Sequence, residues 1–398
     1  MKFRLRHLWL KVHLYLGLTA GLLLALAGLT GSLIVFDHAI DERLNARMMR
    51  TAEQGSPRPL TEIAAAAEAA PNVTGRATTV AYPRVPNGVF TVSFKPKGQA
   101  AEAEVTEVFV DPVTARVLGQ RLRGSGLMAT IYRLHATLLA GKPGEIVLGV
   151  MATLVLVSVV SGVVLWWSLI HAGLRAAFAI RRQKFNFDLH KTVGIVVTPI
   201  LFLIAWTGTH LTLPSVVRPV VTTVFPETKL PQKVKSKSPD AGARSLTADR
   251  AAAVAQARMP GCRPMSVELP VGPDDSFRVF VRQVGEVGDL RGVGRVWVDR
   301  YDGEVLATRD WERFTLADTY FRIQLALHSG DAFGMAGRWL FCAAGLIPAL
   351  LYATGFALWW RKRQSRRRQQ QHAAARPVVP VSQPREQVKA APVEPIEV

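Results

Sequence analysis

The chain has 398 residues and a formal net charge of +19, because 49 Lys and Arg outnumber 30 Asp and Glu. A charge of this size would suit a nucleic-acid-binding protein, but the basic residues cluster beside four long uncharged segments and in the C-terminal tail. The composition therefore favours a membrane protein that does not bind nucleic acid, with a basic tail that could contact anionic lipid head groups.

The four uncharged segments are each long enough to cross a membrane as a helix, which takes about 20 residues for roughly 30 Å of hydrocarbon. They cover residues 12–36, 146–170, 192–213 and 339–360. Lys and Arg are concentrated before the first, between the second and third, and after the fourth. The positive-inside rule predicts a multi-pass membrane protein with both termini in the cytoplasm. The first segment is too long for the apolar core of a typical signal peptide, so we expect it to remain as a helix.

These spans divide the chain into predicted parts that alternate between the membrane and its two sides. In order they are a cytoplasmic N-terminus with the first transmembrane helix (1–36), a periplasmic domain with a membrane-surface helix (37–143), the second transmembrane helix (144–170), a cytoplasmic loop (171–188), the third transmembrane helix (189–213), a second periplasmic domain with a membrane-surface helix (214–338), the fourth transmembrane helix (339–360) and a disordered basic cytoplasmic tail (361–398).

The two outward segments repeat one series of local signals, in which a helical stretch precedes apolar strands and a tight turn. Val108-Phe109-Val110-Asp111 in the first segment matches Val296-Trp297-Val298-Asp299 in the second, and both Asp residues are typical of turns. The predicted helices are 60–70 and 246–258, the strands are 89–94, 105–110, 116–118, 277–281, 294–298 and 304–306, and the membrane-surface helices are 127–139 and 316–328. The pattern predicts two α+β domains and an internal duplication of the whole chain.

Four histidines repeat in register with these halves. In the predicted topology His13 and His190 lie at the cytoplasmic face of the membrane, and His135 and His328 lie at the outer face. Each histidine precedes a hydroxyl-glycine pair at a spacing that is the same in both halves, which predicts small packing positions between helices. These pairs are Thr30-Gly31, Ser161-Gly162, Thr207-Gly208 and Thr354-Gly355.

One pair of histidines at each face suggests two haem sites. A neutral imidazole is a good axial ligand for haem iron, and two imidazoles leave no open coordination position, which suits electron transfer. Small residues would let helices or a flat macrocycle approach closely, and the candidates are Gly17, Gly21, Gly162, Gly194 and Gly355. A single histidine at a helix end is usually an interfacial residue, but four in register favour ligands. Zinc fits less well, because the histidines are separated two and two without nearby Cys, Asp or Glu.

The remaining histidines lack this repetition. His210 lies near the outer end of the third helix, where its counterpart in the first half is Leu33, and it is the most plausible substitute for His135 or His328 as a ligand. We expect solvated surface roles for the others, which are His7, His38, His171 and His372.

Several motifs together resemble the PepSY-associated transmembrane family, which includes ferric-siderophore reductases. They are VHLYLGL with LTGSLIVF at 12–36, RLHATLLAG at 133–141, LHKTVGI at 189–195, LALHSGDAFG at 325–334 and TGFALWW at 354–360, with the outer turns FVDPVTARVLG and WVDRYDGEVLA. The resemblance implies four transmembrane helices, two periplasmic PepSY-type domains and, in the reductase members, haem bound by membrane histidines. Carried over by position, His13 and His190 would bind the inner haem and His135 and His328 the outer one.

The resulting hypothesis is a di-haem inner-membrane oxidoreductase with two haem b groups per chain. It would reduce Fe(III) held by a siderophore or another chelate in the periplasm and so release iron, drawing electrons from a quinol or a cytoplasmic reductase. The alternative is a haem-free accessory or transport protein whose PepSY domains bind a peptide, an envelope protein or an iron chelate. A third possibility is a haem relay whose acceptor is another redox protein.

Overall fold

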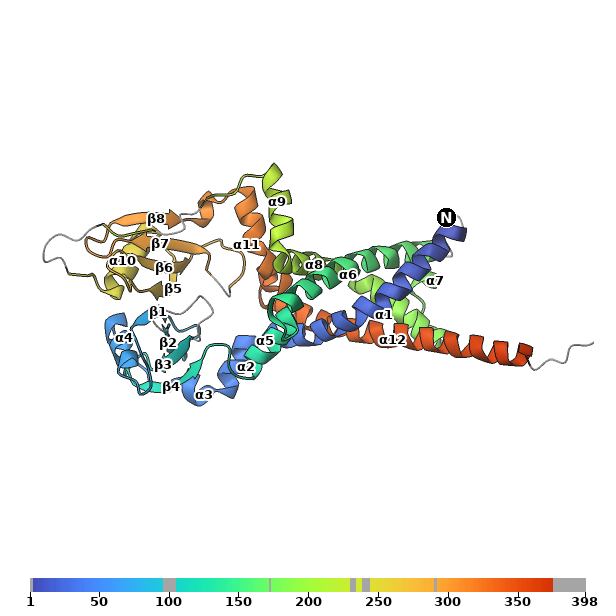
Figure 1. Cartoon of the computed structure of the whole chain (residues 1–398), viewed down its shortest axis with the longest axis horizontal. Coiled ribbons are helices and arrows are strands. Elements are labelled where there is room, and N and C mark those ends of the chain that lie inside the picture. The colour runs from blue at the N-terminus through green and yellow to red at the C-terminus, as the bar shows by residue number, and fades with distance from the viewer. Residues whose placement is uncertain are drawn as a thin grey trace, which may run out of the picture.

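The computed structural model describes residues 3–95, 105–171, 173–229, 234–237, 244–289 and 292–374. It consists of a long helical bundle with a layer of sheet and short helices at one end (Figure 1). We call the end of the bundle that adjoins the sheet the sheet end, and the opposite end the far end.

Four helices long and apolar enough to cross a membrane form the bundle: α1 (Phe3–Ile34), α6 (Gly141–Ile170), α8 (Phe185–Thr212) and α12 (Gly334–Ala374). Uncharged stretches of this length become helices in a bilayer because a helix satisfies every backbone hydrogen-bonding group within itself. Helices α1 and α8 each pack against both α6 and α12, so α1 and α8 lie on one diagonal of the bundle. The chain is therefore a membrane protein, as its composition predicts.

Helices α1 and α12 approach each other closely through small residues. A Cβ atom at Gly28 would come within 2.3 Å of the carbonyl oxygen of Gly345, so only glycine allows this contact. The Ser32 hydroxyl, one turn further along α1, donates a 2.7 Å hydrogen bond to the carbonyl oxygen of Cys342 on α12. Such contacts between small residues commonly hold membrane helices together, because the hydrophobic effect does not drive their association in lipid.

The last helix is longer than its apolar segment. Helix α12 continues without a break to Ala374, whereas the sequence led us to expect disorder from residue 361 onward. The extension is rich in Arg, Lys, Gln and Ala, which are good helix formers and propagate a helix that is already nucleated. Residues 375–398 of the expected tail lie outside the described residues.

A single eight-stranded antiparallel sheet, in the order β4-β3-β2-β1-β5-β6-β7-β8, forms the layer beside the bundle. Read inward from its own edge, the second half runs β8-β7-β6-β5, which matches the order β4-β3-β2-β1 of the first half. The two halves meet at the β1–β5 junction. The strands are β1 (Ala77–Ala81), β2 (Phe90–Phe94), β3 (Thr106–Val110), β4 (Val117–Leu122), β5 (Arg263–Glu268), β6 (Phe277–Arg282), β7 (Gly294–Val298) and β8 (Val305–Arg309). Helices α4 (Leu60–Glu68) and α10 (Ala248–Arg258) pack on the sheet, and their Ile63 and Ala251 share one apolar core with both halves.

The two α+β domains expected from the sequence are thus halves of one sheet. They join through β1 and β5, two strands that the sequence analysis did not predict, with Val80 directly opposite Val267. Neither valine side chain is exposed. An isolated four-stranded half would leave an open edge of unpaired backbone groups at β1 or β5, and the junction removes both edges.

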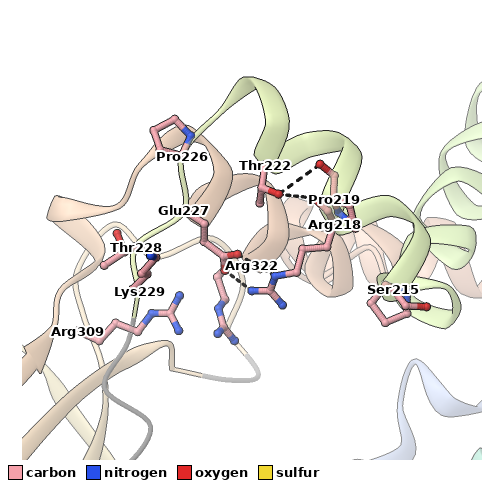
Figure 2. A pocket seen from close by; sticks show the side chains of 11 residues that line it. Ser215, Arg218, Pro219, Thr222, Pro226, Glu227, Thr228, Lys229, Arg309 and Arg322 are labelled. Carbon is pink, nitrogen blue, oxygen red and sulfur yellow. Dashed lines mark hydrogen bonds and ion pairs between the residues drawn. The ribbon is translucent and has the colours of Figure 1, made fainter.

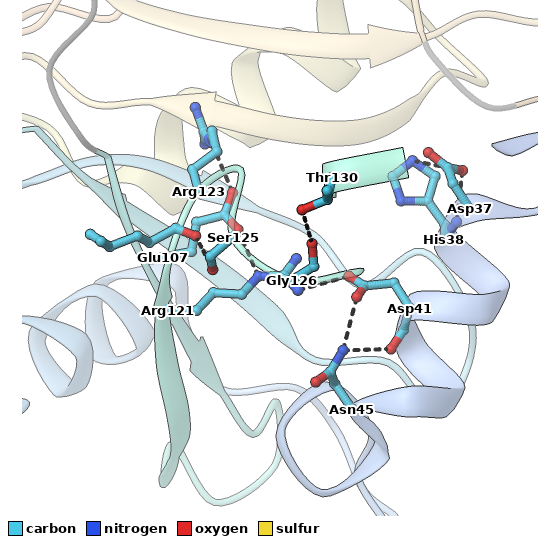
Figure 3. Close-up of polar contacts among 11 residues, drawn as sticks. Asp37, His38, Asp41, Asn45, Glu107, Arg121, Arg123, Ser125, Gly126 and Thr130 are labelled. Atoms are coloured by element: carbon cyan, nitrogen blue, oxygen red, sulfur yellow. Dashed lines mark hydrogen bonds and ion pairs between the residues drawn. The ribbon is translucent and has the colours of Figure 1, made fainter. Parts of the chain in front are cut away.

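Shorter helices connect the sheet with the bundle. Helix α5 packs against α1 and α6, and α11 packs against α8, both at the sheet end. On the first half, Arg121 of β4 bridges Asp41 of α2 at 2.8 Å and Glu107 of β3 at 3.3 Å (Figure 3). The elements between the sheet and the bundle are α2 (Asp37–Leu44), α3 (Ala46–Met49), α5 (Leu127–Thr137), α9 (Pro214–Val224), η2 (Trp311–Arg313), α11 (Leu316–His328) and η3 (Asp331–Phe333). Helices α7 (Leu174–Phe178) and η1 (Arg182–Lys184) lie instead between α6 and α8 at the far end (Figure 1).

Candidate functional site: two facing histidine pairs

At the far end of the bundle, His13 of α1 and His190 of α8 face one another across the diagonal. Their ring centroids are 6.2 Å apart, and the ring planes are nearly perpendicular, at 84°. We call these two residues the far-end pair. The sequence analysis expected them at one membrane face, and the structure brings their rings together.

At the sheet end, His135 and His328 form a second pair, the sheet-end pair. They come from the C-terminal turns of α5 and α11, so short helices outside the bundle deliver both rings to it. The centroid separation is again 6.2 Å, with an interplanar angle of 55°. Each pair therefore takes one imidazole from each half of the chain.

A buried hydroxyl contacts Nδ1 of every one of these four rings. The hydroxyl groups belong to the hydroxyl-glycine pairs, which the sequence analysis read only as packing positions. The distances from Nδ1 to the hydroxyl oxygen are 2.9 Å for His13 and Ser161, 3.0 Å for His190 and Thr354, 3.1 Å for His135 and Thr30, and 2.9 Å for His328 and Thr207.

These hydroxyls determine which ring nitrogen carries the proton. Each one donates its only hydrogen to a backbone carbonyl within its own helix, as Thr207 does to Leu203 at 2.7 Å and Thr354 does to Leu350 at 2.8 Å. Ser161 and Thr30 do the same with Ser158 and Leu26. The hydroxyl oxygen must then accept from Nδ1–H, so the neutral imidazole keeps a free lone pair on Nε2.

The glycine of each hydroxyl-glycine pair makes room for the same ring. A Cβ atom at Gly31 would lie 3.0 Å from Cε1 of His135, and one at Gly162 would lie 3.2 Å from Cε1 of His13. At Gly208 and Gly355 the corresponding distances to His328 and His190 are 3.4 and 3.3 Å. The hydroxyl fixes the ring's orientation, and the glycine allows the ring to lie against the helix.

The geometry of both pairs fits two imidazoles that share one haem iron. Bonds of about 2.0 Å between a metal and an imidazole nitrogen place two such rings roughly 6 Å apart between centroids, close to the 6.2 Å found in both pairs. Gly17 and Gly194 follow His13 and His190 by four positions. An added Cβ atom would meet nothing within 4 Å at Gly17 and a single atom, at 3.8 Å, at Gly194. Open space one helical turn from each ring is compatible with a flat macrocycle there.

The described residues hold no conventional polydentate metal site. In the described part of the chain, no group of three or more His, Cys, Asp or Glu side chains could hold a metal ion. A four-ligand zinc site therefore has no support from these residues.

One residue near the far-end pair escaped the sequence analysis. Asp188 is fully buried in the first turn of α8, and its carboxylate accepts hydrogen bonds from the backbone amide, Nε and Nη2 of Arg181 at 3.0, 2.8 and 2.9 Å. Lys191 lies 3.2 Å away on the same carboxylate. Asp188 is the only acidic residue between residues 171 and 191, which was the available signal. It ties the basic loop to the helix turn that carries His190.

His210 does not take part in either pair. Its ring is buried one turn beyond Thr207 and packs against Tyr320 and Phe321, with centroid distances of 5.3 and 5.4 Å. The sheet-end pair consists of His135 and His328 without it. Three of the remaining histidines, His7, His171 and His372, are exposed.

The two aspartates at matching positions of the halves, Asp111 and Asp299, are turn residues, as the sequence predicts. Asp111 is buried and accepts hydrogen bonds from the amides of Val113 and Thr114, both at 2.9 Å. Asp299 is also buried and accepts from the amides of Tyr301 and Asp302 at 2.7 and 3.2 Å.

The comparisons with known proteins agree with this architecture at the level of a family. No curated protein matches the chain. A family model described as the PepSY-associated TM region matches residues 10–362, which include all four paired histidines. The chain therefore belongs to the PepSY-associated transmembrane family.

Proposed function

We propose that the protein is a di-haem inner-membrane reductase that moves electrons outward to reduce an Fe(III)-siderophore in the periplasm and release its iron. The observation that carries the proposal is the recurrence of one arrangement at both ends of the bundle. Each end holds two imidazoles 6.2 Å apart, each with Nδ1 on a hydroxyl and Nε2 free. Structural histidines at helix ends would not need this matched geometry.

Haem b held by two imidazoles would supply a one-electron carrier with no open coordination position. The chain's own residues hold and orient it. Ser161 and Thr354 set the rings of the far-end pair, and Thr30 and Thr207 set those of the sheet-end pair. Hydrogen bonds of this kind fix the tautomer and raise the basicity of the ligating nitrogen.

The spacing of the two pairs suits transfer across a membrane. His13 and Thr30, which mark the two levels on α1, are separated by about 25 Å along the helix at 1.5 Å per residue. The hydrocarbon layer is roughly 30 Å thick. The two pairs would therefore stand near opposite faces of that layer, and the protein would need no soluble carrier to connect them.

The proposed orientation rests on charge. The far end carries the basic loop and the basic extension of α12, which by the positive-inside rule supports a cytoplasmic far end and a periplasmic sheet. Electrons would enter from a quinol or a cytoplasmic reductase. Each electron would convert one chelated Fe(III) to Fe(II), which oxygen-rich chelators hold more weakly. Separately, the two halves of the chain match in strand order and in the placement of their histidines, which supports an internal duplication.

The test is a visible absorption spectrum of the detergent-purified protein, oxidised and dithionite-reduced, with haem quantified per chain. We expect low-spin bands and about two haems, the number that two histidine pairs allow. His190→Ala should remove about half of the haem, whereas His171→Ala, at an exposed position, should remove none. A colourless protein made with ample haem supply would favour a haem-free accessory protein instead.

A second measurement identifies the acceptor. Protein reduced stoichiometrically and freed of reductant is mixed with a ferric siderophore, and haem reoxidation is followed together with Fe(II) trapped by a chromogenic chelator. Matched yields of oxidised haem and Fe(II) would support chelate reduction. Haem that stays reduced beside the chelate would indicate that another redox protein is the acceptor.

A further inference from the structure

A basic pocket opens between α9, α11 and the end of β8. Its volume is about 1070 Å³, and Figure 2 shows the guanidinium groups of Arg218, Arg309 and Arg322 gathered on one side of it with Glu227. We call this the arginine pocket. Lys229 also lines it, so four cationic side chains face one carboxylate.

The corresponding place in the first half of the sheet is neutralised. There Arg121 of β4 stands opposite Glu107 of β3 in the strand register, and it also bridges Asp41 (Figure 3). In the second half Arg309 of β8 occupies the equivalent position, but the residue opposite it in β7 is Arg295. Like charges directly opposite one another destabilise a sheet. The second half therefore has two arginines opposite one another where the first half has an ion pair within the sheet.

The arginine at the centre of this difference is buried and incompletely paired. The Arg309 side chain is 5% exposed, and its Nη1 has no hydrogen-bond partner in the described part of the chain. Within the described residues, its only carboxylate contact is Asp318, at 3.4 Å. Asp318 also accepts hydrogen bonds from Thr315 and Thr228, at 2.8 and 2.6 Å, so its charge is shared. A buried guanidinium nitrogen without a partner is costly unless a ligand supplies one.

The neighbouring positive charges also make the charged form of these arginines less favourable. Burial, followed by the positive charges of Arg322 and Arg295, lowers the pKa of Arg309 to about 10. Burial, followed by the positive charge of Arg218, also lowers the pKa of Arg322. Arg218 is held by Glu227 through two hydrogen bonds, one of them 2.8 Å from Nε to Oε2. The site thus carries more positive than negative charge, and an anion would offset the excess.

The orientation of α9 shows on which side the anion would arrive. Ser215, Arg218, Pro219 and Thr222 line the arginine pocket. Val216, Val220 and Val224 are 62%, 69% and 69% exposed. At 100° per residue, these two sets are centred roughly 150° apart around the helix. If the exposed valines rest on the lipid, as on an amphipathic surface helix, the pocket faces away from the membrane and toward solvent.

We propose that the arginine pocket binds a soluble anion with several carboxylate or phosphate oxygens. Guanidinium groups match such oxygens with paired hydrogen bonds. A series of contacts links the pocket to the sheet-end pair, because Arg218 lies over the ring of Phe321 at 5.0 Å and Phe321 stacks on His210, one turn from Thr207. The assignment of this anion as a ferric chelate with carboxylate groups, bound for reduction, rests on the proposed function.

The test measures binding of ferric citrate to the oxidised full-length protein in detergent, by equilibrium dialysis with iron quantified on both sides. Arg322→Gln should weaken binding roughly tenfold, the loss of one charge-assisted hydrogen bond. Arg295→Glu, which recreates the ion pair of the first half, should weaken it more while keeping or raising the thermal unfolding midpoint. Glu227→Gln should tighten binding, because it removes the opposing charge. The control Arg258→Gln, at an exposed position of α10, should change nothing.

The outcomes separate this inference from the proposed function, because no reductant is present and haem content is measured independently. Arginine-dependent binding in a haem-free protein would sustain the anion site and reject the reductase. Equal ferric citrate affinity in Arg322→Gln, Arg295→Glu and wild type would overturn the anion site. An anionic phospholipid that co-purifies with wild type, is lost in Arg322→Gln and is not displaced by ferric citrate would also overturn it, in favour of a lipid head group.

Discussion

The hydroxyl oxygen of Thr207 lies 2.9 Å from Nδ1 of His328, although 121 positions separate the two residues in the sequence. The same hydroxyl donates its hydrogen to Leu203, so it can only accept from the imidazole. This contact makes His328 an oriented ring with its free nitrogen directed away from α8, and three further contacts of the same kind orient the other paired histidines.

Replacing Thr207 with Val should keep the shape of the site and remove the acceptor. Loss of the hydrogen bond that orients a ligating imidazole typically costs 10- to 100-fold in affinity at a metal site. We expect Thr207→Val to retain less haem after gel filtration and to shift one of two low-spin electron paramagnetic resonance signals, whereas Thr207→Ser keeps both. Thr209→Val is the matched control, because the Thr209 hydroxyl bonds Ala205 and Thr153 rather than a histidine. Unchanged haem in Thr207→Val would show that the hydroxyl plays no positioning role.

Asp188 should be needed for the far-end pair but not for the sheet-end pair. Removing one partner of a buried ion pair typically costs about 3–5 kcal/mol, because the other charge is left uncompensated. We expect Asp188→Asn to loosen the first turn of α8 and to lower haem occupancy at one site only, measured by haem per chain. Asp274→Asn provides a control, since its partner Lys235 and Asp274 itself are both well exposed and such pairs contribute little. Equal haem loss at both sites would point to general unfolding instead.

The continuous sheet should unfold as one unit. Val80→Ala removes two buried methyl groups at the β1–β5 junction and should cost roughly 2 kcal/mol. Because Val80 and Val267 belong to one core, amide hydrogen exchange should accelerate in β6 and β7 as well as in β2 and β3. The comparison is Val284→Ala, whose side chain is 76% exposed. Faster exchange confined to the first half would mean that the halves are independent domains.

Asp111 should make the sheet sensitive to acid. Burial alone would raise the pKa of its carboxyl, but hydrogen bonds from Thr51 and from the amides of Thr114 and Val113 outweigh it and hold the pKa below the ordinary 3.8. A depressed native pKa stabilises the fold above pH 3.8 and loses that contribution as the pH falls further. We expect the unfolding temperature to fall once the pH is lower than about 4. Asp111→Asn should be less stable at pH 7, and its unfolding temperature should fall less steeply in acid. A parallel decline in both proteins would assign the acid sensitivity to other groups.

Much of this architecture could be predicted from local signals. The four apolar segments predict the bundle, and family membership is confirmed. The repeated spacing of the histidines also anticipated which of them meet, because His13 and His190 occupy equivalent places on parallel helices. Their role as haem ligands stays a prediction.

The parts that were missed depend on contacts between distant segments. Strands β1 and β5 have weak alternation of apolar and polar residues, and they pair with one another across a long stretch of sequence. The sequence aligned His13 with Thr30 on one helix, whereas the structure pairs His13 with Ser161, because α6 runs antiparallel to α1. Helix α9 contains Pro219 and many β-branched residues, which have low helix propensity, so its sequence does not indicate a helix. The arginine pocket needs both the sheet register and α9, so no local pattern could have revealed it.

The division of each histidine pair between the halves has a consequence for the history of the chain. One half provides an oriented imidazole for each end of the bundle, complete with its hydroxyl and glycine, but it provides no second ring to face it. A protein made of one half alone could complete both pairs only by associating with a copy of itself about a two-fold axis. Fusion of two such copies would make that association permanent and would free the halves to diverge, a history that would account for Glu107 in one half and Arg295 in the other.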